Sequence, residues 1–305
     1  MKEVILITGA NGMVAKALTK ILVKKYSIRF LTRVKRNSNE FEWNIEDQFI
    51  EKGAFKNVKH IIHLAGAGIA NNKWSNKRKL IIKSSRIDSA KLILDTLSKN
   101  NIKITSFISS SAIGYYGAET TENIFTEDCN KGNDFLSNLC VEWENIANQF
   151  TLKNLSERTV ILRIGIILSK KGGALEKMVN PIKLYIGSPL GTGKQYMPWI
   201  HIDDLCKIIE YVIEDTKISG IYNAVAPEHI RNLDFTKIIA KTINKPLILP
   251  NVPAFVIRLL FGEMSSILLN GSKVSSKKII KKGYKFKFTN VKDALNDLLS
   301  ANNVA

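Results

Sequence analysis

The chain has 305 residues, 45% of them apolar, and a formal net charge of +18. This length accommodates one large α/β domain with a smaller appendage, and no apolar stretch reaches the roughly 18 residues that span a bilayer. Three cysteines (Cys129, Cys140 and Cys206) show neither Cys-x-x-Cys nor zinc-site spacing, which excludes a recognisable metal motif and favours a reducing, cytoplasmic compartment. The first residues lead straight into an apolar run, so we expect no signal peptide, and because no segment spans a bilayer we expect no membrane partner.

Much of the positive charge lies late in the chain, where seven lysines fall between Lys273 and Lys287. They interleave with Val274, Ile279 and Ile280, a pattern typical of the solvated face of a surface helix and the loop after it. A nucleic acid, a membrane surface or another acidic partner would also use such charge. We favour the solvated helix and therefore expect no nucleic-acid partner.

Short β-rich apolar runs alternate with helical patterns through the first half of the chain, which indicates a parallel sheet with crossover helices. The predicted strands are Glu3–Thr8, Ile28–Thr32, His60–Leu64, Ser106–Ser110 and Thr159–Arg163. The predicted helices between them are Val14–Lys24, Lys77–Lys99 and Phe135–Thr151. This order predicts an α/β fold with a doubly wound parallel sheet of the Rossmann type.

The pattern changes twice in the second half of the chain. After Arg163, glycine-rich segments mark loops around shorter elements, where we expect substrate-side structure. From Pro246 onward, prolines punctuate a linker that precedes an apolar helix at Phe255–Phe261. We predict a Rossmann domain over residues 1–245, with substrate-side segments interleaved from about 164, and a small C-terminal domain over residues 246–305.

The turn Thr8-Gly9-Ala10-Asn11-Gly12 joins the first predicted strand to the first predicted helix. Gly9 allows a tight turn, Gly12 lets a phosphate approach without a Cβ in the way, and Ala15 replaces the third glycine of the dinucleotide fingerprint. Backbone N–H groups at such a helix N-terminus bind a pyrophosphate, although a purely structural turn has the same sequence. The predicted cofactor contacts here are Gly9, Asn11, Gly12, Met13 and Val14.

The residues that close the second predicted strand indicate which cofactor is bound. In this position an acidic side chain hydrogen-bonds the ribose 2′-OH of NAD. Here the strand ends Leu31-Thr32-Arg33, followed by Lys35 and Arg36, with no carboxylate. A hydroxyl and a guanidinium suit a 2′-phosphate, so Thr32 and Arg33 favour NADP over NAD, the alternative being a solvated basic loop.

Three motifs together resemble the extended short-chain dehydrogenase/reductase superfamily: Gly9-x-x-Gly12, His63-Leu64-Ala65-Gly66 and Phe107-Ile108-Ser109-Ser110-Ser111. Further motifs resemble its atypical, epimerase-like family, often labelled nucleoside-diphosphate-sugar epimerase, which has a small C-terminal domain. They include Ser85-Arg86-Ile87-Asp88, Gly114-Tyr115-Tyr116-Gly117, Pro198-Trp199-Ile200-His201-Ile202 and Lys282-Gly283-Tyr284-Lys285-Phe286. The resemblance covers essentially the whole chain.

This resemblance implies more site residues than the turn and the second strand supply. The cofactor contacts that it adds are Leu64, Ala65, Gly66, Arg86 and Arg163. Substrate contacts are implied at Trp199 and His201. Either arginine would pair with phosphate oxygens, and its alternative role is surface charge or packing.

The superfamily normally uses a Tyr-x-x-x-Lys pair, in which the lysine lowers the pKa of the tyrosine so that the phenol exchanges a proton. The resemblance places Leu136 and Cys140 at these positions, and neither side chain can do this. Cys140 lies in an apolar helical pattern, so we expect it to be buried and inert.

We predict Ser111, Tyr115 and Tyr116 as substitutes for the missing pair. Ser111 comes just past a strand end, where a hydroxyl can face the nicotinamide. Either tyrosine ring could instead only pack against the loop. His201 is a further candidate, unless it merely braces the turn before a helix that Asp203 caps.

The leading hypothesis is an NADP-dependent oxidoreductase or epimerase-like enzyme that acts on a small carbonyl or sugar-derived substrate. The second is an NADP-binding sensor or scaffold protein with weak catalysis, for which Leu136 and Cys140 are the argument. We expect a small-molecule substrate and no metal ion, and the sequence allows for a homodimer.

Overall fold

The computed structural model describes residues 2–300, which form two compact units. Within this range the first unit comprises residues 2–115, 135–163 and 206–222. The second comprises residues 116–134, 164–205 and 223–300. The units alternate along the sequence, because the chain leaves the first unit and returns to it twice. The predicted domains, 1–245 and 246–305, are continuous ranges of the sequence, whereas each unit consists of three separate segments. The predicted domain division stays a prediction.

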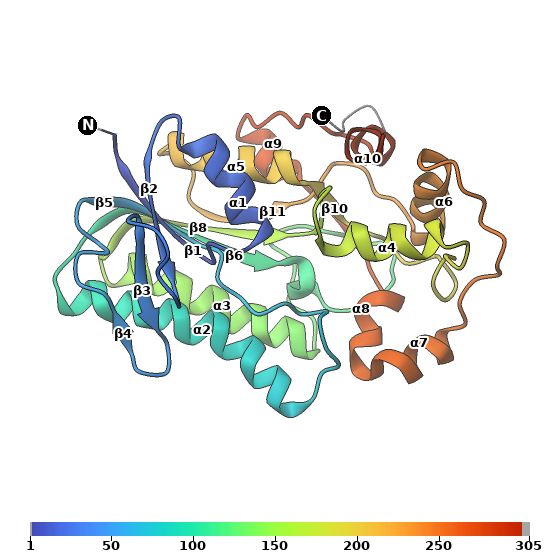
Figure 1. Cartoon of the computed structure of the whole chain (residues 1–305), viewed down its shortest axis with the longest axis horizontal. Helices are drawn as coiled ribbons and strands as arrows, with labels where there is room; N and C mark the ends of the chain where they lie inside the picture. Colours follow the sequence, from blue (N-terminus) through green and yellow to red (C-terminus); the bar gives the residue numbers. More distant parts are fainter. Residues whose placement is uncertain (1, 301–305) are drawn as a thin grey trace. The chain divides into compact units, whose positions relative to one another are not determined.

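An eight-stranded sheet organises the first unit (Figure 1). Its strands lie in the order β11, β8, β6, β5, β1, β2, β3 and β4. In that order they span Gly220–Ala224, Ser156–Ile164, Ile104–Ala112, Val58–His63, Val4–Thr8, Ser27–Thr32, Glu40–Asn44 and Phe49–Ile50. The last residues of β8 and β11 already belong to the second unit.

The sheet is predominantly parallel and changes direction of winding at β1. β1 is parallel to β2 on one side and to β5 on the other, and β2 and β5 continue in parallel to β3 and β6. Only the short edge strand β4 is antiparallel among the strand pairs described for this sheet. The chain therefore builds one half of the sheet from β1 to β3 and then the other half from β5. This confirms the predicted doubly wound α/β fold.

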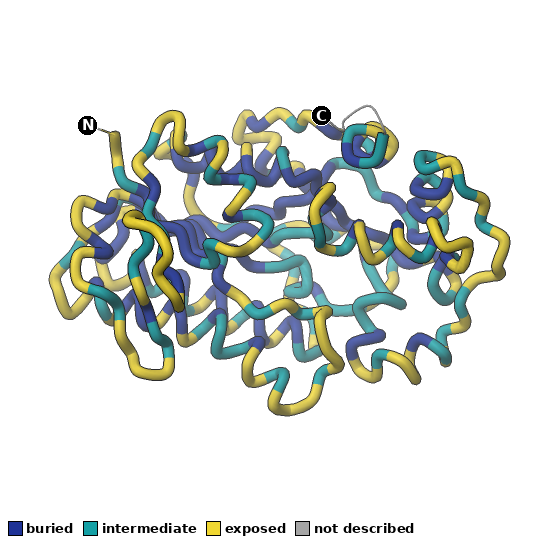
Figure 2. The backbone as a smooth tube through the Cα atoms, in the orientation of Figure 1, coloured by how far each residue is buried: buried dark blue, intermediate teal, exposed yellow. Residues whose placement is uncertain are grey.

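Helices cover both faces of the sheet in the first unit. They are α1 (Met13–Leu22), α2 (Asn76–Lys99), α3 (Phe135–Leu152) and the part of α5 (Ile202–Glu214) that begins at residue 206. α2 and α3 lie side by side on one face and α1 on the other (Figure 1). Between sheet and helices the rings of Phe107 and Phe150 stack with centroids 3.6 Å apart. Figure 2 shows the central strands as a continuous buried layer.

The predicted strands of the first unit are confirmed, with ends that differ by at most three residues. The sequence pattern missed β3 and β4 at one edge of the sheet and β11 at the other. In β3, Glu40-Phe41-Glu42-Trp43-Asn44, acidic residues alternate with apolar ones, and only Trp43 is buried. An edge strand that is half solvated lacks the apolar run on which the other strands were predicted.

Short strands and helices build the second unit. β9 (Ile166–Leu168) pairs in parallel with β10 (Trp199–His201), and β7 (Ile124–Phe125) with β12 (Lys273–Val274). A core that includes Trp199, Phe235 and Leu295 lies among α4, α6 and α10. The helices of this unit are α4 (Gly173–Lys183), α6 (Asn232–Thr242), α7 (Ala254–Phe261), α8 (Ser266–Leu269), α9 (Lys277–Lys281) and α10 (Val291–Leu299), with a 3₁₀ turn at Gly262–Ser265. Another 3₁₀ turn, Ile113–Tyr116, lies where the chain passes from the first unit to the second.

The lysine-rich segment contains the short helix α9 and a following loop. Ile279 on α9 is fully buried, whereas Lys277, Lys281 and Lys282 are exposed, in agreement with the predicted solvated helix face. Within residues 2–300, no helix is both long enough and apolar enough to cross a membrane.

Candidate functional site

The turn between β1 and α1 requires glycine at position 9 for two reasons. Gly9 has a φ of +73°, a left-handed conformation that costs other L residues about 1–2 kcal/mol. A Cβ built on Gly9 would also lie only 2.8 Å from the carbonyl oxygen of Leu64. The turn therefore lies directly against the carboxyl end of β5, and Asn11 is exposed at its tip.

The N-terminus of α1 offers backbone donors to an anion. Gly12 occupies the N-cap position with extended backbone, no side chain caps the helix, and its first turn contains no acidic residue. The first intrahelical bond that closes on Gly12 comes from the N–H of Lys16, at 3.1 Å from the Gly12 carbonyl oxygen. The N–H groups of residues 13–15 have no intrahelical acceptor, as in any first turn. This arrangement fits a pyrophosphate.

Thr8 and His63 fix the two strand ends relative to each other. The Thr8 hydroxyl accepts the N–H groups of Leu64 and Ala65, each at 3.0 Å, and lies 3.0 Å from His63 Nδ1. Since both backbone N–H groups donate to this oxygen, its own proton is directed to Nδ1. His63 then carries its proton on Nε2, which faces the Arg86 carbonyl oxygen at 3.3 Å. Complete burial lowers the pKa of His63 to about 4, so the ring is neutral.

The end of β2 exposes positive charge. Thr32 is buried, and its hydroxyl donates to the carbonyl oxygen of Val34 at 3.1 Å. Arg33 is exposed, and within residues 2–300 its side chain has no hydrogen-bond or ion-pair partner. Lys35 is paired with Glu51 at 2.8 Å, so it is less available to a ligand than Arg33. The cationic group next to the predicted ribose position is therefore the Arg33 guanidinium.

Arg86 on α2 is a buried cation beside Gly66. Its Nη1 donates to the carbonyl oxygen of Ile82 at 2.9 Å, whereas its Nε is buried without a hydrogen-bond partner among the described residues. A Cβ on Gly66 would lie 2.9 Å from the guanidinium carbon, so the absence of a side chain there makes room for Arg86. Burial lowers the pKa of Arg86 to about 10. A buried guanidinium with one donor unused suits an anionic ligand group.

Arg163 is engaged by a protein carboxylate. Its Nε and Nη2 each donate to Glu144 at 2.8 Å, one to each carboxylate oxygen, and both side chains are buried. The Ser111 hydroxyl donates to the same Glu144 Oε1 at 2.7 Å. The Tyr115 ring covers the guanidinium, with its centroid 3.3 Å from the guanidinium carbon. Ser111, Tyr115 and Arg163 thus come together around Glu144, while a phosphate contact by Arg163 stays a prediction.

Tyr116 belongs to the second unit and is buried. Its hydroxyl donates to Asn223 Oδ1 at 2.7 Å, and its ring packs on Phe125 with centroids 5.2 Å apart. The Asn223 amide in turn donates to the Ser275 carbonyl oxygen at 3.1 Å. The Tyr116 hydroxyl proton therefore has a protein acceptor, which favours the packing role over a proton relay.

Leu136 and Cys140 lie on the buried face of α3. The Cys140 thiol donates weakly to the Ala112 carbonyl oxygen at 3.6 Å, and burial raises its pKa to about 12. A thiol with that pKa is neither a nucleophile nor a proton donor at neutral pH. The expectation that Cys140 is buried and inert agrees with this environment.

Trp199 and His201 lie on β10 in the second unit, and both are buried. His201 directly precedes α5, and its Nδ1 accepts the N–H of Asp203 at 3.1 Å. The ring therefore takes the place of an N-cap side chain, and Asp203, which was expected to be the cap, lies inside the first turn. The correction follows from the helix beginning at Ile202, two residues earlier than a cap at Asp203 requires. Of the two roles considered for His201, proton transfer or bracing of this turn, the hydrogen bond to Asp203 favours bracing.

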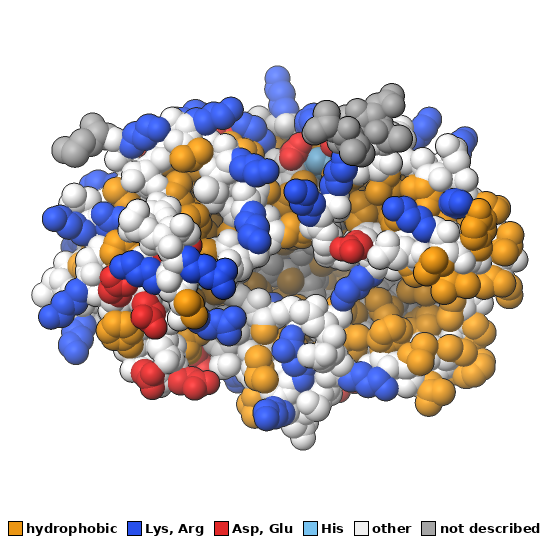
Figure 3. Space-filling view, in the orientation of Figure 1, with side chains coloured by type: hydrophobic (Ala, Val, Ile, Leu, Met, Phe, Trp, Pro, Cys, Tyr) orange, Lys and Arg blue, Asp and Glu red, His pale blue; other side chains and the backbone are white. Residues whose placement is uncertain are grey.

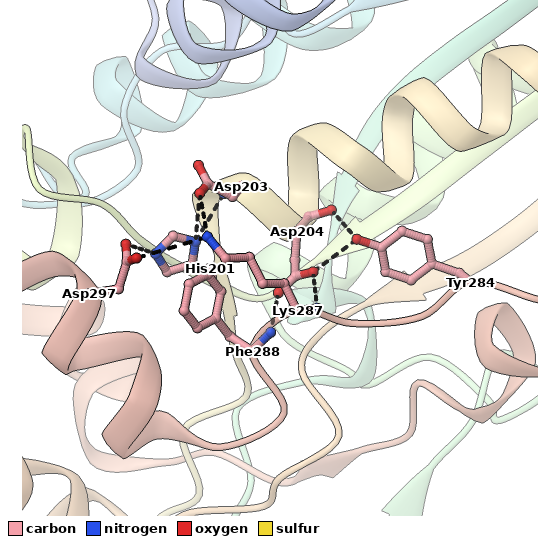
Figure 4. Close-up of polar contacts among 7 residues, drawn as sticks. All are labelled: His201, Asp203, Asp204, Tyr284, Lys287, Phe288 and Asp297. Atoms are coloured by element: carbon pink, nitrogen blue, oxygen red, sulfur yellow. Dashed lines mark hydrogen bonds and ion pairs between the residues drawn. The ribbon is translucent and has the colours of Figure 1, made fainter.

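Around His201 lie two carboxylates, Asp203 and Asp297, and one ammonium group, Lys287 (Figure 4). Asp203, Asp297 and His201 offer atoms within 4.8 Å of one another, a separation that would suit a metal ion. The Lys287 ammonium, however, lies 3.6 Å from Asp203 and 3.9 Å from Asp297. Because Nδ1 accepts an N–H group, the neutral ring carries its proton on Nε2, 3.4 Å from Asp297 and outside hydrogen-bond geometry. That proton and the ammonium both compete with a metal, so the cluster is better explained as an ion-pair network.

Burial lowers the pKa of His201, against the opposing effect of the nearby carboxylates. Next to it, Asp204 organises a loop. Its carboxylate accepts the Tyr284 hydroxyl at 2.9 Å and the backbone N–H groups of Lys287 and Phe288 at 2.8 and 2.9 Å. The Phe288 ring packs on His201 with centroids 3.9 Å apart. Asp204 thereby joins the start of α5 to the segment before α10 (Figure 4).

The sequence reasoning missed Glu144, which holds Ser111 and Arg163. A signal was available, because Leu136, Leu139, Cys140 and Trp143 form an apolar stripe at helical spacing that Glu144 continues. A carboxylate on the buried face of a helix needs hydrogen-bond donors from elsewhere in the fold, and an arginine or lysine in the core is one such partner.

A sheet that reverses its winding at β1, a glycine turn against β5 and an uncapped α1 define a Rossmann-type dinucleotide-binding protein of the extended short-chain dehydrogenase/reductase class. Residues 5–224 match the NAD dependent epimerase/dehydratase family. The chain belongs to this family, which supports a nicotinamide cofactor and confirms the resemblance seen in the sequence. Residues 252–298 match a domain of unknown function, DUF1731.

Proteins that are similar to the chain over nearly its whole length are also described as epimerase family proteins. The chain is 36% identical over 299 residues to the epimerase family protein SAR0825 of Staphylococcus aureus, with 97% of this chain and 98% of that protein covered. It is 32% identical over 304 residues to the Arabidopsis thaliana chloroplastic SDR39U1 homolog, an epimerase family protein, with 96% and 86% covered. A crystal structure of the human epimerase family protein SDR39U1 (isoform 2) with NADPH is similar at a TM-score of 0.88 and 27% identity, covering 99% of this chain and 100% of that one.

Proposed function

We propose that this protein is an NADP(H)-dependent oxidoreductase or epimerase-like enzyme that acts on a small carbonyl or sugar-derived substrate. The observation that carries the choice of cofactor is the end of β2, where Arg33 is exposed and unpaired among the described residues. The nearest following carboxylate, Glu40, accepts the backbone N–H groups of Arg36 and Asn37. A 2′-phosphate would meet a guanidinium and no competing anion. The NADPH in the human relative supports the same choice.

The roles of the residues follow from their positions. Gly9 and Gly12 leave room for the pyrophosphate, and the N–H groups of residues 13–15 donate to it. The Thr8 hydroxyl holds Leu64 and Ala65 against the turn, and Arg86 places a cation beside Gly66. The nicotinamide supplies or accepts the hydride when the cofactor is bound.

Ser111 has a defined hydrogen-bond polarity in this scheme. Its proton is donated to Glu144, which also accepts two N–H groups of Arg163, so the Ser111 oxygen offers lone pairs to a ligand. It would accept a hydroxyl or amide proton from substrate or cofactor. Tyr115, whose ring lies on Arg163, is the phenol to which this scheme assigns proton exchange.

Hydride transfer is the test of this proposal. The small aldehydes are mixed with the protein and NADPH, whereas the nucleoside-diphosphate sugars, whose carbinol carbons donate a hydride, are mixed with the protein and NADP+, and the nicotinamide fluorescence is followed through one turnover. The proposal predicts hydride transfer with at least one substrate class, seen as loss of NADPH fluorescence with an aldehyde or as gain of it with a sugar, and slowed at least tenfold in Tyr115→Phe. If no compound of either panel changes the redox state of the bound cofactor, the enzymatic part of the proposal is contradicted.

A second candidate is an NADP-binding sensor or scaffold protein with little catalysis. It is favoured by Leu136 and Cys140, which occupy the positions of the usual tyrosine and lysine, and by the high pKa of Cys140. Cells that carry only Ser111→Ala or Tyr116→Phe would then keep the function, whereas Arg33→Glu would abolish it. The enzyme hypothesis predicts loss of function in Ser111→Ala as well.

The proposal includes a compartment, the cytoplasm, and a partner, a small-molecule substrate. All three cysteines are free thiols, in keeping with a reducing compartment such as the cytoplasm. A small molecule is the partner that the site of the first unit would take, and a homodimer is compatible with it.

A further inference from the structure

The second unit exposes an unusual amount of apolar surface in two short segments. Within residues 2–300, ten large apolar side chains are more than half exposed, and six of them lie between 184 and 186 or between 248 and 260. We name these six the apolar patch: Leu184, Ile186, Ile248, Phe255, Leu259 and Leu260. Figure 3 shows apolar side chains gathered on the surface of this unit over α4, α6 and α7.

Contacts between the two segments make the patch one surface. Lys245 donates to the Tyr185 hydroxyl at 2.7 Å, and the Ser188 hydroxyl donates to the Pro250 carbonyl oxygen at 2.6 Å. Leu190 and Val252 form a parallel bridge, and α7 begins two residues later. The six side chains together expose on the order of 600 Å² of apolar surface, which equals or exceeds the largest such patch on a typical monomer.

The helix α7 contributes most to the patch. Phe255, Leu259 and Leu260 are 70%, 77% and 55% exposed, whereas only Ile257 of this helix is buried. Helix α7 thus turns an apolar face outward, and its one charged residue, Arg258, is exposed as well. Burial inside the second unit therefore accounts for Ile257 and does not explain why the exposed residues of this face are apolar.

The charges around the patch are mostly positive. Residues 177–202 and 235–262 carry seven lysines and arginines and no aspartate or glutamate, and one exposed glutamate, Glu263, directly follows the second segment. Lys183 adjoins Leu184, and Arg258 adjoins Leu259. A second copy of this chain, docked through the same patch, would bring these cations together without a carboxylate from either segment to pair them. An anionic lipid surface complements both properties, because acyl chains receive the apolar side chains and phosphates receive the cations.

We infer that the apolar patch attaches the second unit to the surface of a membrane that contains anionic lipids. The attachment is peripheral, with Phe255 and Leu259 inserted at the level of the lipid headgroups and Lys183 and Arg258 against the phosphates. The sequence raised a membrane surface as an alternative only for the lysines between 273 and 287, and the expectation of no membrane partner rested on the lack of a segment that spans a bilayer. The inference is independent of the cofactor and of the reaction.

Vesicle sedimentation with the full-length protein tests this inference. We expect the protein to sediment with phosphatidylcholine vesicles that contain phosphatidylglycerol, at least tenfold more strongly than with phosphatidylcholine alone. The double variant Phe255→Ser/Leu259→Ser should lose at least tenfold of this affinity, and Lys183→Glu/Arg258→Glu should lose the preference for anionic lipid. Raising the salt concentration should weaken the binding of the wild type.

A matched control is available in the first unit, where Leu80 and Leu152 are 66% and 71% exposed. The variant Leu80→Ser/Leu152→Ser removes as much exposed apolar surface and should sediment like the wild type. Unchanged thermal melting and NADPH affinity in every variant would show that the fold is intact. Equal vesicle binding by the patch variant and the wild type overturns the inference. So does a dimer in sedimentation velocity that the patch variant abolishes, without any vesicle binding, since the second copy would then be the occupant.

Discussion

The buried pair of Glu144 and Arg163 gives a stability prediction with a definite magnitude. Arg163 is 1% exposed and Glu144 is 4% exposed. Two donors from Arg163 and one from Ser111 converge on the carboxylate, at 2.7 to 2.8 Å. Glu144→Ala leaves the guanidinium charged in a dry environment, and removing one partner of a buried pair costs about 3–5 kcal/mol. We expect the free energy of unfolding to fall by this amount.

Urea denaturation followed by circular dichroism measures this loss, and a double-mutant cycle separates its causes. Replacing both residues, as Glu144→Leu/Arg163→Met, removes the stranded charge. The double variant should therefore be more stable than Glu144→Ala. Its loss of stability should be at least about 2 kcal/mol smaller than the sum of the losses measured for Glu144→Leu alone and Arg163→Met alone. Additive effects, or a cost below about 1 kcal/mol for Glu144→Ala, would refute the role that we give to the pair.

Three further predictions follow from buried polar groups. The pKa of His63 is about 4 in the fold against about 6.5 in the unfolded chain. The contribution of the neutral ring to the free energy of unfolding is therefore present above pH 6.5 and is lost as the pH falls toward 4, by about 3 kcal/mol in all. Urea titrations across this range should show a smaller pH dependence of stability in His63→Asn than in the wild type, and an equal pH dependence would contradict the neutral ring. Asp204→Ala should cost about 2–4 kcal/mol because three donors lose their acceptor, whereas Asp203→Ala, at an exposed position, should cost under about 1 kcal/mol, as thermal melting can check. Iodoacetamide should label the partly exposed Cys129 well before the buried Cys140, whose pKa is about 12, and mass spectrometry that finds Cys140 labelled first would disprove its burial.

Local sequence patterns were sufficient for the strands β1, β2, β5, β6 and β8 and for the helices α1 to α3 of the first unit. β1, β5 and β6 are apolar runs between turns, and the turn at Gly9 carries its own signature, since both the positive φ and the approach to Leu64 demand glycine. The same patterns failed where an element is half solvated or very short. β4, for example, has two residues, and Phe49 in it is exposed.

The site was predictable where it depends on the backbone and not where it depends on pairing across the fold. The phosphate turn and Arg33 are adjacent in sequence to a strand end. Glu144, by contrast, meets Arg163 across 19 residues and Ser111 across 33. No local pattern gives the partner of a buried charge, because the partner is chosen by how helix and strands pack. The role of His201 likewise depended on where α5 begins, a boundary that sequence patterns place only to within a few residues.

The preference for NADPH over NADH tests the central claim most directly. Isothermal titration of the purified protein with each cofactor, for the wild type and for Arg33→Asp, compares the four dissociation constants. We predict that the wild type binds NADPH at least tenfold more tightly than NADH. In Arg33→Asp, NADPH binding should weaken by about 10- to 100-fold, from the loss of a charge-assisted contact worth about 1.5–3 kcal/mol, while NADH binding is kept. Equal affinities for the two cofactors in the wild type, or NADPH affinity that Arg33→Asp leaves unchanged, would contradict the account.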